Sequence, residues 1–339
     1  MDTLEIDGSF GEGGGQVLRT AVSLSCMTGR PVRISRIRAG RKKPGLARQH
    51  LAAVGVLARA CGAKTRGLAE GSTELEFAPG NAWDGTAAAD VGTAGSIPLI
   101  LSAVIPAASI RGGMEVSLAG GTDVSWSPTI EYTGRVLREA YSRMGIDYSI
   151  NVERRGYYPR GGGSVSASIQ PCRVPRPILL GSDKPEQAEL LCSYSKMPRD
   201  KVEAAAKEAA CSLEEDGCSI HTEIGRGDAD DPGGTALLYS SGHGHVRGAD
   251  ALYKEGGFGG LHRGFARSDA GADDHLADML VVPASLADGT SVITVDNVSG
   301  HLGTCLYVAS RMTGCRYGYS GIGRGHEVWI EGRSDARVH

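Results

Sequence analysis

The sequence predicts an α/β (α+β) protein, with a large domain of repeated α/β units and a smaller α/β domain inserted into it. Short β-type runs recur along the chain, each followed by a glycine-bearing turn and a helix with an apolar face. After about residue 176 this pattern gives way to charged helical sequence and then to glycine-rich sequence. A chain of 339 residues is also long enough for two or three folding units. We therefore expect residues 1–180 and 271–339 to form the large domain and residues 181–270 the insert.

The repeats begin at the N-terminus. TLEID leads through a glycine-rich turn to QVLRTAVSLSCMT, a predicted helix that Gly29 can end. PVRISRI leads through RAGRKK to a predicted helix with Pro44 in its first turn, which runs to Cys61 and stops at Gly62. MEVSLAGGTD is followed in the same way by SPTIEYTGRVLREAYSRMG. This recurrence indicates duplicated α/β units.

The other segments complete the prediction. VGTAGSIPLILSAVIPA is almost entirely apolar and predicts a buried helix, while YSINVERRGYYPRGGGSVSASI predicts two strands joined by a Pro/Gly turn. In the insert we expect a strand, an amphipathic helix and a strand, and then a solvated acidic loop, GRGDADDPGG. The stretch VRGADALYKEGGFGGLHRGFARSDAGADD is too rich in glycine to predict a helix. HLADMLVVPASL onward returns to the large domain.

Composition limits the classes of protein. The hydrophobic fraction of 41% and the charged fraction of 22% are typical of soluble globular proteins. The net charge is −3, so contact with nucleic acid would need a local basic patch. The chain has no apolar run long enough to span a membrane, and MDTLEIDGSF lacks the pattern of a signal peptide. We expect a cytoplasmic protein with no membrane partner, and a homo-oligomer is compatible with the sequence.

The eight cysteines are scattered and contain no C-x-x-C pair, which favours reduced, mostly buried thiols over disulfides or a zinc site. Cys211 with Cys218, and His243 with His245, each supply only two candidate ligands. A tetrahedral metal site needs more than two ligands of this kind.

Basic residues gather at the first two turn-to-helix junctions, namely Arg19, Arg38, Arg41, Lys42, Lys43 and Arg48. If these junctions face one cleft, helix N-termini and guanidinium groups could together hold phosphates. The alternative is a surface of unrelated arginines.

Two further residues are candidates for chemistry. Glu12, in GSFGEGGGQVLRT, could share Mg²⁺ or Mn²⁺ with a phosphate, or could simply favour the dipole of the following helix. His301 follows the strand-like ITVD. The sequence predicts a helix that begins close to His301 and that Gly314 can end. With an unperturbed pKa of about 6.5 an imidazole is a competent nucleophile, although a structural role is the alternative.

Several motifs together carry a family resemblance. DGSFGEGGGQVLRTAVSLS, IRAGRKKPGLARQHLAAV, GTAGS, GGTD…SPT, GYYPRGGG, HLADMLVVP and SGHLGT resemble the motifs of RNA 3′-terminal phosphate cyclases in order and spacing. The resemblance covers nearly the whole chain and is strongest before residue 165. It implies repeated βαβαβ-type units similar to enolpyruvyl transferases, with a small inserted domain. It also implies a ligase that uses ATP to convert RNA 3′-phosphate ends to 2′,3′-cyclic phosphates, through histidine–AMP and RNA(3′)pp(5′)A, releasing AMP and diphosphate.

The resemblance also implies roles for individual residues. His301 would be the nucleophile, and Glu12 the ligand of Mg²⁺ or Mn²⁺. Asp278 would orient the histidine or the nucleotide ribose. The phosphate and RNA-end site would comprise Gln16, Arg19, Arg38, Arg41 and Gln49. The ATP site would comprise Ser102, His275, Leu276, Ala277, Asp278 and Met279.

Four positions depart from the family pattern. His275 replaces an expected tyrosine, Ser102 and Met279 replace glutamines, and Cys305 replaces an asparagine. The first three concern the nucleotide pocket, so contacts with adenine and ribose could differ there. Two other classes of protein remain as alternatives: a non-catalytic, cyclase-like RNA-binding protein of ribosome assembly, and an enolpyruvyl transferase, whose fold fits but whose motifs do not.

Overall fold

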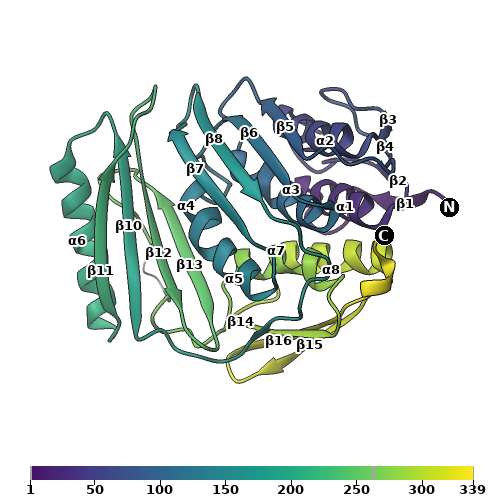
Figure 1. Cartoon of the computed structure of the whole chain (residues 1–339). Coiled ribbons are helices and arrows are strands. Elements are labelled where there is room, and N and C mark those ends of the chain that lie inside the picture. Colours follow the sequence, from purple (N-terminus) through teal and green to yellow (C-terminus); the bar gives the residue numbers. More distant parts are fainter. Residues whose placement is uncertain (1, 262–263, 339) are drawn as a thin grey trace.

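Three copies of a βαβαββ unit make up most of the computed structural model, which describes residues 2–261 and 264–338 (Figure 1). The first comprises β1 (Leu4–Asp7), α1 (Gly15–Thr28), β2 (Val32–Ser35), α2 (Arg48–Cys61), β3 (Lys64–Arg66) and β4 (Leu75–Ala78). The second comprises β5 (Thr86–Asp90), α3 (Ile97–Arg111), β6 (Met114–Gly120), α4 (Ile130–Tyr132), the π-helical η1 (Thr133–Leu137), α5 (Arg138–Arg143), β7 (Tyr148–Arg154) and β8 (Gly163–Ile169). The third comprises β9 (Leu179–Leu180), α7 (Asp274–Ala284), β14 (Thr290–Val295), α8 (Gly300–Thr313), β15 (Arg316–Ile322) and β16 (Gly325–Glu331), and a short 3-10 helix, η2 (Ser334–Ala336), follows it.

The three units share one strand order. In each, the first strand pairs in parallel with the second, the second pairs antiparallel with the fourth, and the fourth pairs antiparallel with the third. The resulting sheets are β1-β2-β4-β3, β5-β6-β8-β7 and β9-β14-β16-β15. The repeated α/β units predicted from the sequence are confirmed, and the predicted hairpin is present as β7 and β8.

Helices from all three units pack against one another. Helix α1 contacts α2, α3 and α8, and α7 contacts α8. Figure 1 shows α7 and α8 between the sheet of the second unit and that of the third. Helix α3, predicted to be buried, has Ile100, Leu101 and Val104 in the core. This packing brings the N-terminal ends of helices from different units into one region.

Glycines end three helices as predicted, but one helix begins later than predicted. Gly29, Gly62 and Gly314 end α1, α2 and α8 in the left-handed conformation that glycine adopts without a Cβ penalty. Helix α2, however, begins at Arg48, so the prediction that Pro44 lies in its first turn is wrong. Tertiary hydrogen bonds hold the preceding segment in a loop, because the backbone N–H of Leu46 donates to Ser72 and that of Gly45 to Ile37.

Between β9 and α7 the chain forms a fourth sheet. It comprises β10 (Gln187–Ser195), β11 (Ser219–Arg226), β12 (Gly233–Ser241) and β13 (Val246–Leu252), in the order β11-β10-β12-β13. Helix α6 (Arg199–Glu215) contacts β10 and β11, and its buried side chains, including Val202 and Leu213, form a second core with Leu190 and Leu238. Leu191 and Leu237 instead join the main core. Residues 262 and 263 of the glycine-rich stretch lie outside the described residues.

Two arginines of the second unit, Arg155 and Arg160, join it to the fourth sheet and its loops. The guanidinium of Arg155 donates to Asp123, Glu131 and Ser193, the last of which lies on β10. Arg160 donates to Asp231 through its backbone N–H (3.0 Å) and its side chain (2.9 and 2.7 Å). The prediction of a solvated GRGDADDPGG loop is therefore wrong at Asp231, which is buried in this contact. Local composition does not reveal such a partner.

The cysteine prediction is confirmed: all eight are free, and seven are buried, with Cys211 exposed. Within the described part of the chain, no helix combines the length and apolar character needed to cross a membrane.

Candidate active site

The glycine-rich loop between β1 and α1 lies against the N-terminus of α8. Oε2 of Glu12, in the loop, is 3.2 Å from Nε2 of His301 on α8. Glycine is needed on both sides: a Cβ on Gly300 would lie 2.8 Å from Oε1 of Glu12, and one on Gly11 would lie 2.3 Å from Oγ1 of Thr304. The glycines thus allow the close approach of two segments from opposite ends of the chain.

Two arginines border the same loop. Nη2 of Arg41 lies 3.9 Å from Oε2 of Glu12. Nη2 of Arg19 donates to Oε1 of Gln16 at 2.6 Å, and its Nε is buried without a hydrogen-bond partner among the described residues. A buried, unpaired donor is costly, and an anion placed here could accept from it. The guanidinium groups of Arg19 and Arg41 could therefore donate hydrogen bonds to a negatively charged ligand.

Arg38 belongs to the same positively charged region. Its backbone has a φ of +54°, and its Nη1 donates to the carbonyl oxygen of Gly45 at 2.8 Å. Burial lowers the pKa of Arg38, and the charge of Arg41 lowers it further. Burial, with the charges of Arg19 and Arg38, likewise lowers the pKa of His50 to about 3. The sequence analysis did not select His50, although it follows Gln49 in the second motif, and this neutral imidazole packs beneath Gly15.

Gln49 lies toward another part of the site. Its Oε1 accepts from the backbone N–H of Ser96 at the N-terminus of α3, at 3.2 Å. Lys42 and Lys43 are exposed, and Arg48 pairs with Glu70 at 3.5 Å. The structure therefore places Arg41 beside Glu12, and Gln16 and Arg19 on the helix that follows the glycine-rich loop. Gln49 joins α2 to the N-terminus of α3.

The local electrostatics favour a neutral His301. Burial lowers its pKa, and the positive charges of Arg19, His275 and Arg41 lower it further, whereas Glu12 opposes the shift. The imidazole is about 41% exposed. A neutral, accessible imidazole beside arginines is suited to nucleophilic attack on a phosphate ester.

Helix α7 contributes Asp278 and His275. Asp278 is buried, and burial raises the pKa of its carboxyl to about 7 against the opposing charges of His275 and Arg19. His275 is exposed, with its ring edge-to-face with Tyr132 at a centroid distance of 6.4 Å. Met279 is half-buried, and its backbone carbonyl accepts from Tyr141.

Three predicted ATP-site residues have local or packing roles in the structure. The side chains of Leu276 and Ala277 lie in the core and are not exposed to a ligand. The family resemblance selected them for the ATP site, and it does not distinguish side chains that face the core from those that face a ligand. Oγ of Ser102 donates to the carbonyl of Leu99 one turn earlier in its own helix.

Cys305, where the family pattern has asparagine, is buried beneath the site. Its Sγ accepts from Nε2 of Gln16 at 3.0 Å and lies 3.6 Å from Oγ1 of Thr20. Burial raises the pKa of the thiol to about 12, so it is uncharged. Hydrogen bonds thus link Cys305 to Gln16 and Gln16 to Arg19.

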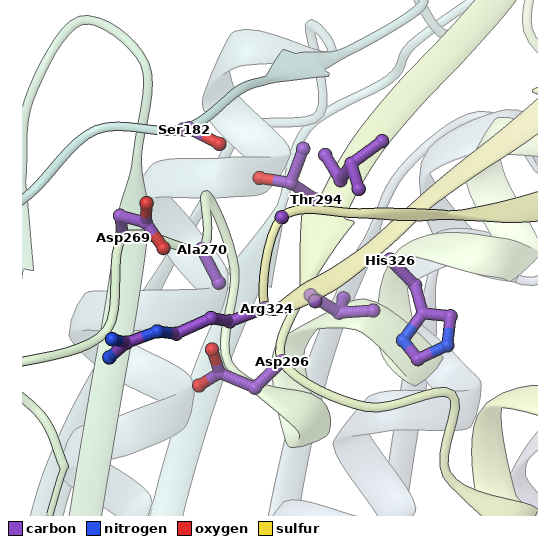
Figure 2. Close-up of a pocket in the computed structure, with 11 residues that line it drawn as sticks. Ser182, Asp269, Ala270, Thr294, Asp296, Arg324 and His326 are labelled. Carbon is purple, nitrogen blue, oxygen red and sulfur yellow. The ribbon is translucent and has the colours of Figure 1, made fainter.

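Two other polar clusters lie apart from this site. Nδ1 of His245 contacts Asp183 and Nε2 contacts Ser240, each at 2.9 Å, but Oγ of Ser240 also donates to the carbonyl of Gln187 at 2.6 Å. The hydroxyl proton of the buried Ser240 is therefore donated to a backbone carbonyl and not to His245, so this serine is not activated as a nucleophile. The second cluster lines a cavity of about 110 Å³ near the β15–β16 turn. Figure 2 shows Asp269, Asp296 and Arg324 extending toward one another there.

The fold and the site together define a protein of repeated α/β units whose glycine loop, arginines and neutral histidine are suited to phosphate chemistry. The sequence model of the RNA 3′-terminal phosphate cyclase family matches residues 10–319. The chain belongs to this family.

Curated relatives named RNA 3′-terminal phosphate cyclase align over most of both chains. That of Methanopyrus kandleri is 39% identical over 329 residues, which cover 92% of this chain and 93% of the relative. That of Archaeoglobus fulgidus is 37% identical over 326 residues, with 92% and 96% covered. That of Nostoc punctiforme is 37% identical over 322 residues, with 88% and 91% covered.

Proposed function

We propose that this protein uses ATP to convert RNA 3′-phosphate ends to 2′,3′-cyclic phosphates through a covalent AMP adduct of His301. The relatives' names support cyclisation of an RNA 3′-terminal phosphate. The observation that carries the proposal is the position of His301 beside Glu12, within a region that Arg19 and Arg41 make positive. Negatively charged triphosphate and RNA ends are attracted to such a region.

In the first step, the lone pair of a neutral His301 ring nitrogen attacks the α-phosphorus of ATP. The phosphorus–nitrogen bond forms as the bond to the β-phosphate oxygen breaks, and diphosphate leaves. Arg19 and Arg41 stabilise the negative charge that develops on the phosphates. The lowered pKa of His301 keeps the lone pair available near neutral pH.

In the second step, an oxygen of the RNA 3′-phosphate attacks the same phosphorus, and the phosphorus–nitrogen bond breaks. RNA(3′)pp(5′)A forms, and His301 is released in its original state. The 2′-hydroxyl then attacks the terminal RNA phosphorus, AMP leaves, and the hydroxyl proton passes to solvent. Because this hydroxyl is already tethered beside the phosphorus, ring closure gains a large proximity effect. DNA lacks the hydroxyl and would not cyclise.

Mg²⁺ or Mn²⁺ fits Glu12 only together with substrate. The carboxylate is about 45% exposed, and the described residues contain no group of three metal-ligating side chains. Mg²⁺ commonly binds through one or two carboxylates plus substrate phosphates. The carboxylate of Glu12 together with the phosphates of ATP would provide such ligands. When bound, such a cation would supply charge neutralisation for the triphosphate and the departing diphosphate.

The other predicted residues would bind and orient. Gln16, Arg38 and Gln49 would join the arginines in holding the phosphates and the RNA end. His275, Asp278, Met279 and Ser102 would contact or border ATP. Asp278, which interacts electrostatically with Arg19 and His275, would orient His301 or the nucleotide ribose. Leu276 and Ala277 would support this helix from the core.

Labelling with [α-³²P]ATP in the presence of Mg²⁺ or Mn²⁺ tests the covalent step. The wild-type protein should acquire acid-labile label, and His301→Ala should abolish it without loss of folding. His221→Ala is a matched control, because His221 is 73% exposed on β11 of the insert. A wild-type protein that binds 3′-phosphorylated RNA but never acquires label or yields cyclic product would contradict the proposal. It would favour the alternative of a non-catalytic, cyclase-like RNA-binding protein.

A further inference from the structure

Two exposed aromatic side chains border one cavity beside Gln49. Trp126 is 99% exposed and Tyr158 is 79% exposed. Together with Gln49, Ser96 and Leu99 they line a cavity of about 460 Å³. Large exposed apolar side chains that gather at a hollow commonly mark an interaction site.

The two loops that carry these aromatics are held in place. On one side of Trp126, the hydroxyls of Ser127 and Ser96 are hydrogen-bonded, and the backbone N–H of Thr129 donates to Oδ2 of Asp250 at 2.5 Å. Trp126 itself has a φ of +68°, a backbone conformation that is costly for a side chain of this size. The anchored loop therefore holds the indole in solvent, where it gains no packing energy.

Tyr158 is presented in the same way. The backbone N–H of Gly161 donates to the carbonyl of Tyr157 at 2.8 Å, and that of Arg160 donates to Asp231 at 3.0 Å. The phenol ring thus projects from a segment that is fixed at both ends. Rigid aromatic groups bind with a small loss of conformational entropy.

Polar and charged groups border the aromatics on both sides. Trp126 also borders a second cavity, of about 440 Å³, which Lys254 lines together with Asp250 and Glu255. Nζ of Lys254 donates to Oγ of Ser125 at 3.1 Å, and Asp250 accepts from the backbone N–H of Thr129. Gln49, on the other side, belongs to the proposed RNA-end site. The aromatics therefore lie between an amide assigned to the RNA terminus and a cation that a more distant phosphate could reach.

We propose that Trp126 and Tyr158 form a stacking platform for the unpaired bases of RNA that lie just upstream of the 3′-phosphate. This inference rests on the proposed function, because it extends the same RNA-end site outward from Gln49. Every base offers a π-face, so stacking tolerates any terminal sequence. Because the net charge of the chain is −3, its overall field does not attract RNA, and local contacts must supply the affinity.

The test measures the affinity of a 5′-fluorescein-labelled, single-stranded RNA with a 3′-phosphate by anisotropy, without ATP. The Trp126→Ala variant should bind about 10-fold more weakly than wild type, since stacking contributes on the order of 1–3 kcal/mol per base. The wild type should lose at least this factor when the two nucleotides before the last are abasic. For the abasic RNA, Trp126→Ala should bind little more weakly than wild type, since the base that Trp126 would stack on is already absent. Tyr319→Ala, which removes an aromatic 56% exposed on β15, should bind as wild type.

Two results would overturn the inference. One is a Trp126→Ala variant that binds intact RNA as tightly as wild type; the other is an abasic penalty equal in variant and wild type. Weaker binding of ATP, measured without RNA, together with normal RNA binding, would place Trp126 in the nucleotide site and overturn it too. Failure of the wild type to form cyclic product would instead count against the proposed function, because the binding assay needs no turnover.

Discussion

Nε2 of His301 lies 3.2 Å from Oε2 of Glu12, so the imidazole and the carboxylate are electrostatically coupled. The pair joins the glycine loop that precedes α1 to the first turn of α8. The carboxylate raises the pKa of His301, while burial and nearby cations lower it, and the net shift is downward. The protonation state of the proposed nucleophile thus depends on a residue that would also bind the metal.

Glu12→Gln should lower the pKa of His301 further. The variant loses the charge that stabilises the imidazolium, while burial, Arg19 and Arg41 continue to favour the neutral ring. NMR titration of the metal-free protein, with isotope-labelled histidine, should show wild-type His301 titrating below 6.5 and the variant lower still. Glu70→Gln, which removes an exposed carboxylate paired with Arg48, should leave the His301 titration unchanged. A rise in the variant would show that Glu12 does not act on His301 in this way.

Gly15→Ala should damage the site more than the fold. The new Cβ would lie 2.3 Å from Nε2 of His50 and 2.9 Å from Nη1 of Arg19, so both side chains must move. We expect a loss of about 1–2 kcal/mol in unfolding free energy, typical of overpacking, and a fall of about tenfold or more in the rate of self-labelling. Gly225→Ala on β11 places its Cβ in open space and is the matched control for both measurements. Normal labelling by Gly15→Ala would remove Arg19 from the proposed phosphate site.

Asp278→Asn should become more stable than wild type as pH rises. The pKa of the buried carboxyl is raised to about 7, above its unfolded value near 3.8. Its contribution to stability is therefore fully present below about pH 4 and is lost as pH rises through 7, by up to about 4 kcal/mol. The neutral amide avoids this loss, so thermal unfolding at pH 8 should favour the variant, and at pH 4 the two should be similar.

Activity should fall in the same Asp278→Asn variant, because an amide replaces the proposed nucleotide-orienting carboxyl. Asp288→Asn, at an exposed position beyond the end of α7, controls for the removal of a carboxylate. A variant that is less stable than wild type at pH 8 would contradict the conclusion that burial destabilises the ionised carboxylate of Asp278.

Trp126→Gly should unfold at a temperature no lower than wild type. The residue has a φ of +68° and its side chain is almost wholly exposed, so glycine removes backbone strain and little packing. Relief of the strain should raise the free energy of unfolding by about 1 kcal/mol. The greater freedom of glycine in the unfolded chain offsets part of this gain. Trp126→Ala keeps the Cβ, and its unfolding temperature should not exceed that of Trp126→Gly. A clear drop with glycine would mean that the indole packs in a way its exposure does not suggest.

Local patterns were sufficient to predict much of the fold. The glycines at 29, 62 and 314 end helices because only a residue without Cβ adopts the left-handed conformation freely. The apolar run of α3 is buried because it has no polar face. Errors arose where a distant partner decides the structure. Asp231 is buried because Arg160 binds it, and α2 starts late because Leu46 is hydrogen-bonded to Ser72.

By itself, the sequence determined the class of fold, the repeated units and the family, because these depend on periodicity, turn residues and motif order. It also selected Glu12, His301 and the arginines as candidates. Only the tertiary structure decided that the side chains of Glu12 and His301 lie 3.2 Å apart, that Leu276 and Ala277 face the core, and that Cys305 accepts a hydrogen bond from Gln16. The physical reason is that distances and burial depend on how helices from different units pack, and spacing along one chain segment carries no information about that packing.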